Sequence, residues 1–262
     1  MPKQGTAQVD EAVGLLVGGR GWRKRHYLFE SFMQSPGLNA DVIGTTTSMA
    51  ISNKNFEASG TNATAALCAL DDNGGIKLTT AGADNDQTGV VAHTDTDQTS
   101  WFEDEGCVFD TDQAPAIEVK IKTGSAITDQ IIWAGLAITH PATYDVSDDA
   151  DRVVFDYDSA AATNGGKWRL AYSVAGTDYT HDTGLTVVAD TTYVAQIFIR
   201  EDRYVDAFIG DANDMGSAKH VRTANKMTAN ILTLIPGVFV EAQAAAAKHM
   251  YLRYIAMGFN NN

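Results

Sequence analysis

The chain has 262 residues, of which 44% are hydrophobic and 20% are charged, and its formal net charge is −14. This composition can fill an apolar core, which excludes a disordered chain. No run of about 18 apolar residues is present, so we expect no membrane-spanning segment. Residues 1–30 have a charge balance of +2 (five Lys or Arg, three Asp or Glu), which leaves −16 for residues 31–262 (14 basic, 30 acidic). Because nucleic acid binding needs clustered Lys and Arg, the acidic body argues against a nucleic acid partner.

Residues 1–45 read as a partly irregular N-terminal arm, interrupted by glycines and by a Ser-Pro-Gly turn at 35–37. Within it, residues 22–29 place bulky aromatic side chains beside basic ones. Such a mixture is typical of a segment that packs on another surface, either its own domain or a neighbouring subunit. Six residues of the arm are therefore our partner-binding candidates: Trp22, Arg23, Lys24, Arg25, Tyr27 and Phe29.

Residues 46–262 read as one β domain, because alternating apolar and polar residues recur between clusters of turn-forming residues. In Ile117–Lys122, for example, every second side chain is apolar, which predicts a strand with one buried face. Glu201–Arg203 predicts a tight hairpin between two such strands. The predicted strands are Ser48–Ser52, Ile76–Thr80, Gly89–Thr94, Cys107–Asp110, Ala116–Thr123, Gln130–Thr139, Arg152–Tyr157, Lys167–Val174, Leu185–Val188, Tyr193–Glu201, Tyr204–Ile209, Gly237–Ala242 and His249–Met257.

The acidic side chains are the candidates for a catalytic site or a calcium site. A glycosidase needs two carboxylates on either side of the sugar bond, and two pairs share a strand face: Glu103 with Glu105, and Asp156 with Asp158. We interpret both pairs as solvated edges and expect no enzymatic activity. Calcium would need six to eight oxygen ligands. The acidic clusters Asp145, Asp148, Asp149 and Asp151, and Asp84, Asp86, Asp95 and Asp97, match no calcium loop, and Asp also caps turns with its own side chain.

The remaining candidates also favour structural roles. The six histidines are scattered without a zinc-like spacing, and no phosphate-binding or nucleophile motif occurs. Cys68 and Cys107 are too few for a disulfide framework, so we expect two buried thiols. Trp133 and Trp168 lie in apolar strands and favour core packing over a sugar-stacking platform with Trp101. We therefore predict no catalytic residue, metal or cofactor.

Four stretches together resemble a known fold. Thr191–Gly210 looks like the characteristic hairpin of the concanavalin-like jelly roll, the sandwich of legume lectins, laminin-G modules and some glucanases, and Lys248–Met257 looks like its last strand. Ile76–Trp101, with its two Asp-x-Asp-Gln-Thr turns, and Thr123–Leu136 are similar to structural proteins of tailed-phage particles. The resemblance implies an all-β, antiparallel two-sheet jelly-roll sandwich with an extended N-terminal arm. The Glu-x-Asp-x-x-Glu strand of the glucanases is absent from this chain.

The resemblance also implies a function. We expect a non-enzymatic virion structural protein, a capsid-decorating or surface-exposed head component assembled in the host cytoplasm. Its partners would be other virion proteins, above all the major capsid protein, and further copies of itself, with a trimer suiting three-fold positions on a capsid. The alternative is a carbohydrate-binding module of a tail or surface fibre, for which a glycan would be the partner.

Overall fold

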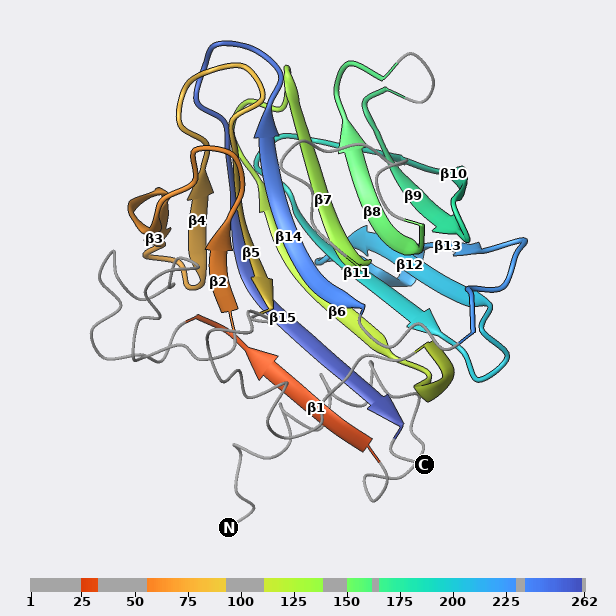
Figure 1. Cartoon of the computed structure of the whole chain (residues 1–262). Helices are drawn as coiled ribbons and strands as arrows, with labels where there is room; N and C mark the ends of the chain where they lie inside the picture. The colour runs from red at the N-terminus through yellow and green to blue at the C-terminus, as the bar shows by residue number, and fades with distance from the viewer. Residues whose placement is uncertain are drawn as a thin grey trace.

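The structure is a computed structural model that describes residues 25–32, 56–92, 111–138, 150–161, 165–229 and 234–260. These residues form two antiparallel sheets stacked face to face (Figure 1). The predicted all-β jelly-roll sandwich is therefore confirmed. Within the described residues, helix is limited to three short 3-10 turns, Ala65–Leu67, Thr111–Gln113 and Met215–Ser217. None of the helices found there has the length and apolar character needed to cross a membrane.

Sheet A has the strand order β13-β12-β11-β6-β15-β4-β3, and β1 pairs with β15 as an eighth strand. Sheet B has the order β10-β9-β8-β7-β14-β5-β2. The strands of sheet A are β1 (Arg25–Glu30), β3 (Cys68–Leu70), β4 (Ile76–Thr79), β6 (Ala116–Thr123), β11 (Thr192–Ile199), β12 (Val205–Asp211), β13 (Lys219–Arg222) and β15 (His249–Asn260). The strands of sheet B are β2 (Phe56–Ser59), β5 (Gln87–Ala92), β7 (Gln130–Ala137), β8 (Arg152–Asp158), β9 (Lys167–Val174), β10 (Thr177–Thr186) and β14 (Ile235–Ala242).

The core lies between the sheets and is filled by every second residue of the strands. Ile117, Val119 and Ile121 of β6 point into it, as the alternation predicts. Trp168 of β9 is fully buried, and its ring meets Tyr193 of β11 edge to face at 5.5 Å. This contact joins the two sheets, which confirms the predicted core position of Trp168.

The predicted hairpin at Glu201–Arg203 is confirmed, because Ile199 of β11 pairs with Val205 of β12. Four strands were missed: β1, β2, β3 and β13. The predicted strand Leu185–Val188 overlaps only the last two residues of β10, Leu185 and Thr186. β1 lies inside the predicted arm and pairs antiparallel with the far half of β15, as Figure 1 shows. Part of residues 1–45 thus belongs to sheet A. The predicted strands Ser48–Ser52 and Cys107–Asp110 lie outside the described residues.

The first Asp-x-Asp-Gln-Thr segment is a turn held by Asp86. One carboxylate oxygen of this buried residue accepts the backbone N–H groups of Gly82 and Ala83, at 2.7 and 2.6 Å. The other oxygen accepts Asn62 Nδ2 at 2.6 Å, which ties the turn to the loop after β2. The predicted turn chemistry is confirmed here. The second copy, Asp95–Thr99, lies outside the described residues.

These hydrogen bonds give Asp86 a pH-dependent effect on stability. The bonds from Asn62, Ala83 and Gly82 hold its pKa below the usual value. A carboxyl group with a lowered folded-state pKa stabilises the protein above its unfolded pKa, about 3.9, and loses this effect as the pH falls further. We expect Asp86→Asn to lower the urea midpoint at pH 6 and to differ less from wild type at pH 3. The exposed neighbour Asp84, changed to Asn, is the control and should alter neither midpoint. A difference for Asp86→Asn that is the same at both pH values would contradict this role.

Candidate functional site

The outer face of sheet B carries an aromatic pair at its centre. Phe239 of β14 and Trp133 of β7 are cross-strand neighbours, and their rings stack with centroids 4.8 Å apart and planes 6° apart. Gly89 of β5 lies next to Phe239, and a Cβ at this position would meet the Phe239 ring and lie 2.6 Å from the Val238 carbonyl oxygen. Both rings are buried. Trp133 is therefore packed, as predicted, although it does not point into the space between the sheets.

A buried ion pair continues this row across the sheet. Asp156 of β8 pairs in register with Trp133 on one side and with Arg169 of β9 on the other. Arg169 Nε donates to Asp156 Oδ1 at 3.2 Å, and Nη2 forms a second ion pair with Oδ2, so the contact is bidentate. Asp156 is only 1% exposed. Its interpretation as part of a solvated edge is therefore wrong, because Arg169 supplies the compensating charge that burial requires.

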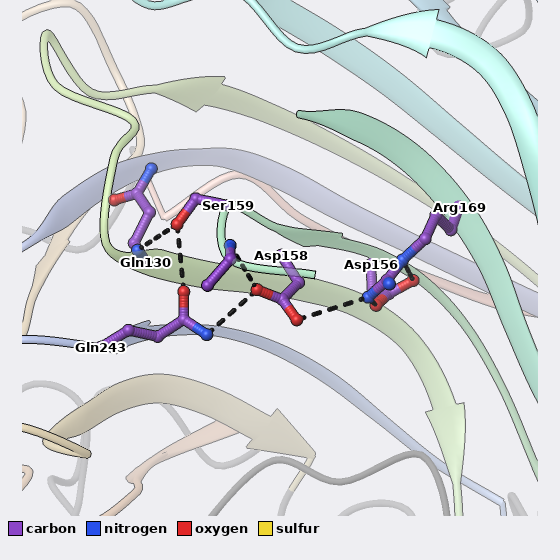
Figure 2. Close-up of polar contacts among 7 residues, drawn as sticks. Gln130, Asp156, Asp158, Ser159, Arg169 and Gln243 are labelled. Carbon is purple, nitrogen blue, oxygen red and sulfur yellow. Dashed lines mark hydrogen bonds and ion pairs between the residues drawn. The ribbon is translucent and has the colours of Figure 1, made fainter. Parts of the chain in front are cut away.

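Asp158, two residues further along β8, belongs to a hydrogen-bonded chain that Figure 2 shows. Its Oδ1 accepts the Ala160 N–H at 2.9 Å and Gln243 Nε2 at 3.0 Å. Gln243 Oε1 in turn accepts the Ser159 hydroxyl at 3.0 Å, and the Ser159 oxygen accepts the Gln130 N–H at 2.9 Å. The chain therefore joins the end of β8, the start of β7 and the residue after β14, so that each side chain is held on both sides.

Four of these side chains form what we call the β8 rim: Asp158, Ser159, Arg169 and Gln243. All four are partly exposed, with side-chain exposures of 20% for Asp158 and 14% for Arg169. Asp158 Oδ2 lies 3.9 Å from Arg169 Nη2, beyond hydrogen-bonding distance. The rim thus presents a positioned carboxylate oxygen beside guanidinium, amide and hydroxyl groups.

Glu241 of β14 is a further carboxylate on the outer face of sheet B. It was not identified from the sequence. Glu241 and Asp158 both pair in register with Ile131, so the two carboxylates lie on either side of β7. Glu241 is buried, and its Oε2 accepts Gln87 Nε2 at 2.6 Å. A charged residue inside the apolar strand Ile235–Ala242 was the signal that could have identified it.

The partner-binding candidates that the structure describes lie on sheet A. Trp22, Arg23 and Lys24 are outside the described residues, while Arg25 and Tyr27 belong to β1. The Phe29 side chain is 44% exposed, and its ring lies 5.3 Å from that of Tyr254 of β15, so it belongs to sheet A. The structure therefore does not place the described members of this group at the β8 rim.

Other sequence candidates are only partly described. Several candidates lie outside the described ranges: Glu103, Glu105, Trp101, Cys107 and five of the calcium candidates in the loops (Asp95, Asp97, Asp145, Asp148 and Asp149). In those ranges, no three His, Cys, Asp or Glu side chains gather as metal ligands would. Asp151 is buried and faces the N–H groups of Ala175 and Thr228, both at 3.4 Å. Cys68 is a buried free thiol, as predicted, and burial raises its pKa to about 12.

No protein family matches the chain, and no curated protein sequence matches it. Solved structures do match. A protein of unknown function from Shewanella oneidensis MR-1 aligns with a TM-score of 0.60 at 13% identity, covering 91% of this chain and 87% of its own. Peanut lectin aligns with a TM-score of 0.55 at 11% identity, covering 90% and 97%. Basic winged bean lectin, solved with Tn-antigen, aligns with a TM-score of 0.52 at 6% identity, covering 91% and 100%. At these identities the likeness concerns the fold, which is the sandwich of the legume lectins.

Proposed function

We propose that this domain is a non-enzymatic carbohydrate-binding module and that the β8 rim contacts the sugar. The observation that carries the proposal is the state of Asp158. One oxygen is fixed by Gln243 and by the Ala160 N–H, while the other makes no hydrogen bond within the described residues. Sugar hydroxyl groups donate to such carboxylate oxygens and accept from guanidinium and amide groups, so a preorganised set costs little ordering entropy on binding.

The same contacts favour binding over hydrolysis. A glycosidase needs one carboxyl group that gives up a proton and a second that acts as base or nucleophile. Asp156 is buried, and both of its oxygens contact Arg169, so its carboxylate is not placed to reach a sugar. Glu241 is buried and hydrogen-bonded to Gln87, with Ile131 between it and Asp158. We therefore assign the carboxylates of this face to binding and to stability.

A glycan array probed with the full chain, followed by calorimetry on the best ligand, tests the proposal. We expect Asp158→Asn to weaken binding at least tenfold, because a lost charge-assisted hydrogen bond is worth about 1.5–3 kcal/mol. Asp178→Asn is the matched control, since this exposed carboxylate lies on β10 of the same sheet and bonds Ser173 at 2.6 Å. Wild-type affinity in Asp158→Asn, or an array without any bound glycan, would refute the assignment.

From the resemblance to tailed-phage proteins we infer a virion component that assembles with further copies and with other virion proteins. A truncation that tests the arm should remove residues 1–24 only, because removal of residues 1–45 also deletes β1 from sheet A. If particles take up the truncated chain at full occupancy, the arm does not provide the docking contact.

A further inference from the structure

The outer face of sheet A gathers three cations around one tyrosine. Tyr251 of β15 pairs in register with Lys77 of β4 on one side and with Lys122 of β6 on the other. Lys77 Nζ lies 6.0 Å and Lys122 Nζ 5.4 Å from the centroid of the Tyr251 ring, and Arg253 Cζ lies 5.3 Å from it. We call these four side chains the Tyr251 cluster. Each distance is within the range of a cation–π contact, so the ring holds the cations together.

A β-bulge brings Arg253 into the cluster. The register of β15 against β6 shifts between Leu252 and Tyr254, and Arg253 is the additional residue. Leu252 is buried in the core, whereas Tyr251, Arg253 and Tyr254 are partly exposed. The guanidinium is held by the Asp71 carboxylate and the Gly74 carbonyl oxygen. Gly75 has a φ of +78°, and a Cβ there would lie 2.8 Å from Arg253 Cα, so only glycine fits this close approach.

The positive charges of the cluster exceed the negative charges that face them. Lys122 faces Asp190 at 3.5 Å, and Arg253 is paired with Asp71. In the described part of the chain, Lys77 has no carboxylate partner. The neighbouring ring of His249, 5.6 Å from that of Tyr251, responds to this field: burial and the charges of Lys77 and Lys122 lower its pKa, against an opposing effect of Asp190. The cluster is thus a local positive field, which attracts anions, in a chain of net charge −14.

We propose that the Tyr251 cluster binds a single oxyanion of the sulfate, phosphate or carboxylate type, either free or carried on a small molecule. The two lysines supply strong charge-assisted donors, and Arg253 adds a third charge that its bonds to Asp71 and Gly74 keep in place. A long polyanion fits less well, because Asp190 and Asp71 flank the cations and the rest of the chain is acidic. The cluster lies on sheet A and the β8 rim on sheet B, so this proposal does not depend on the proposed carbohydrate site.

Calorimetric titration of the full chain with sodium phosphate and with glucose 6-phosphate, at one fixed ionic strength, tests the site. We expect saturable binding that weakens at least tenfold in the double variant Lys77→Gln, Lys122→Gln. The matched control is Lys219→Gln, Lys226→Gln, which removes two exposed lysines from the other edge of the molecule and should leave the affinity unchanged. Tighter binding of glucose 6-phosphate than of phosphate supports a ligand that carries the anion on a small molecule, and equal binding supports the free ion.

The pKa of His249, measured by NMR with and without phosphate, provides a second readout. A variant that merely folds poorly would not reproduce the expected change. Phosphate should raise the pKa of His249 in the wild type, because the bound anion offsets the field of Lys77 and Lys122, and should leave it unchanged in the Lys77→Gln, Lys122→Gln variant. The proposal fails if wild type shows no saturable binding or if both double variants lose affinity equally. It also fails if a duplex DNA oligonucleotide binds more tightly than phosphate and with a steep salt dependence, the behaviour of a polyanion surface.

Discussion

Replacement of Phe239 by alanine is expected to lower the free energy of unfolding by about 3–5 kcal/mol, the cost of removing a large buried aromatic side chain. Phe239 is fully buried, stacks on Trp133 and covers Gly89. Its removal takes away the ring that stacks on Trp133 and opens a cavity that Gly89, which has no side chain, cannot fill. Urea unfolding followed by Trp fluorescence measures the loss.

Phe208→Ala is the matched control for this experiment. Phe208 lies on the outer face of sheet A, is only half-buried and stacks on His220 with centroids 4.5 Å apart. A partly exposed ring loses less contact area, so we expect a cost of about 1 kcal/mol. Equal losses in the two variants would show that the outer face of sheet B is not a packed layer.

Arg169→Met should also cost about 3–5 kcal/mol at pH 7, because it removes the guanidinium that makes a bidentate contact with the buried Asp156 carboxylate. Methionine keeps the length and apolar stem of the side chain, so lost packing contributes little. The same strand offers a matched control, Lys167→Met. Lys167 pairs with Asp182 at 2.7 Å, but side-chain exposures of 37% and 29% leave this pair in contact with water, and its loss should cost at most about 1 kcal/mol.

A double-mutant cycle separates the ion pair from its surroundings. Asp156→Asn in the Arg169→Met background removes the buried negative charge of Asp156. It should therefore recover a large part of the stability lost in Arg169→Met. The urea midpoints of wild type, the two single variants and the double variant complete the cycle. Strictly additive losses would mean that Asp156 and Arg169 stabilise the sheet independently, contrary to their bidentate contact.

The strands that the sequence predicts are those with one apolar face. β6 and β11 alternate clearly because one side of each faces the core. Most of β10 was missed because it is an edge strand whose residues are mostly exposed and polar, so its sequence resembles a loop. β13, also at an edge, is a four-residue strand with the same character. Each of these two strands is defined by its pairing with one neighbour, β9 for β10 and β12 for β13. Amino-acid composition does not reveal such a pairing.

The candidate sites depend on strand register more than on local sequence. That Asp156 and Asp158 share a face was predictable from their spacing, but their burial was not, because Arg169 meets Asp156 only through the pairing of β8 with β9. Gln243 reaches Asp158 from a position 85 residues later in the chain. The Tyr251 cluster draws its members from β4, β6 and β15, and nothing in the local sequence marks the bulge that adds Arg253.

The strand order also determines when the two sheets can be completed during synthesis. β14 lies between β7 and β5 in sheet B, and β15 lies between β6 and β4 in sheet A. The strands translated last in the sandwich therefore occupy the interior of both sheets. Until they leave the ribosome, β4 and β5 lack the partners that join them to the rest of their sheets, and their apolar faces stay uncovered. Such non-local pairing makes folding slow and mainly post-translational, so nascent chains should depend on chaperones to avoid aggregation.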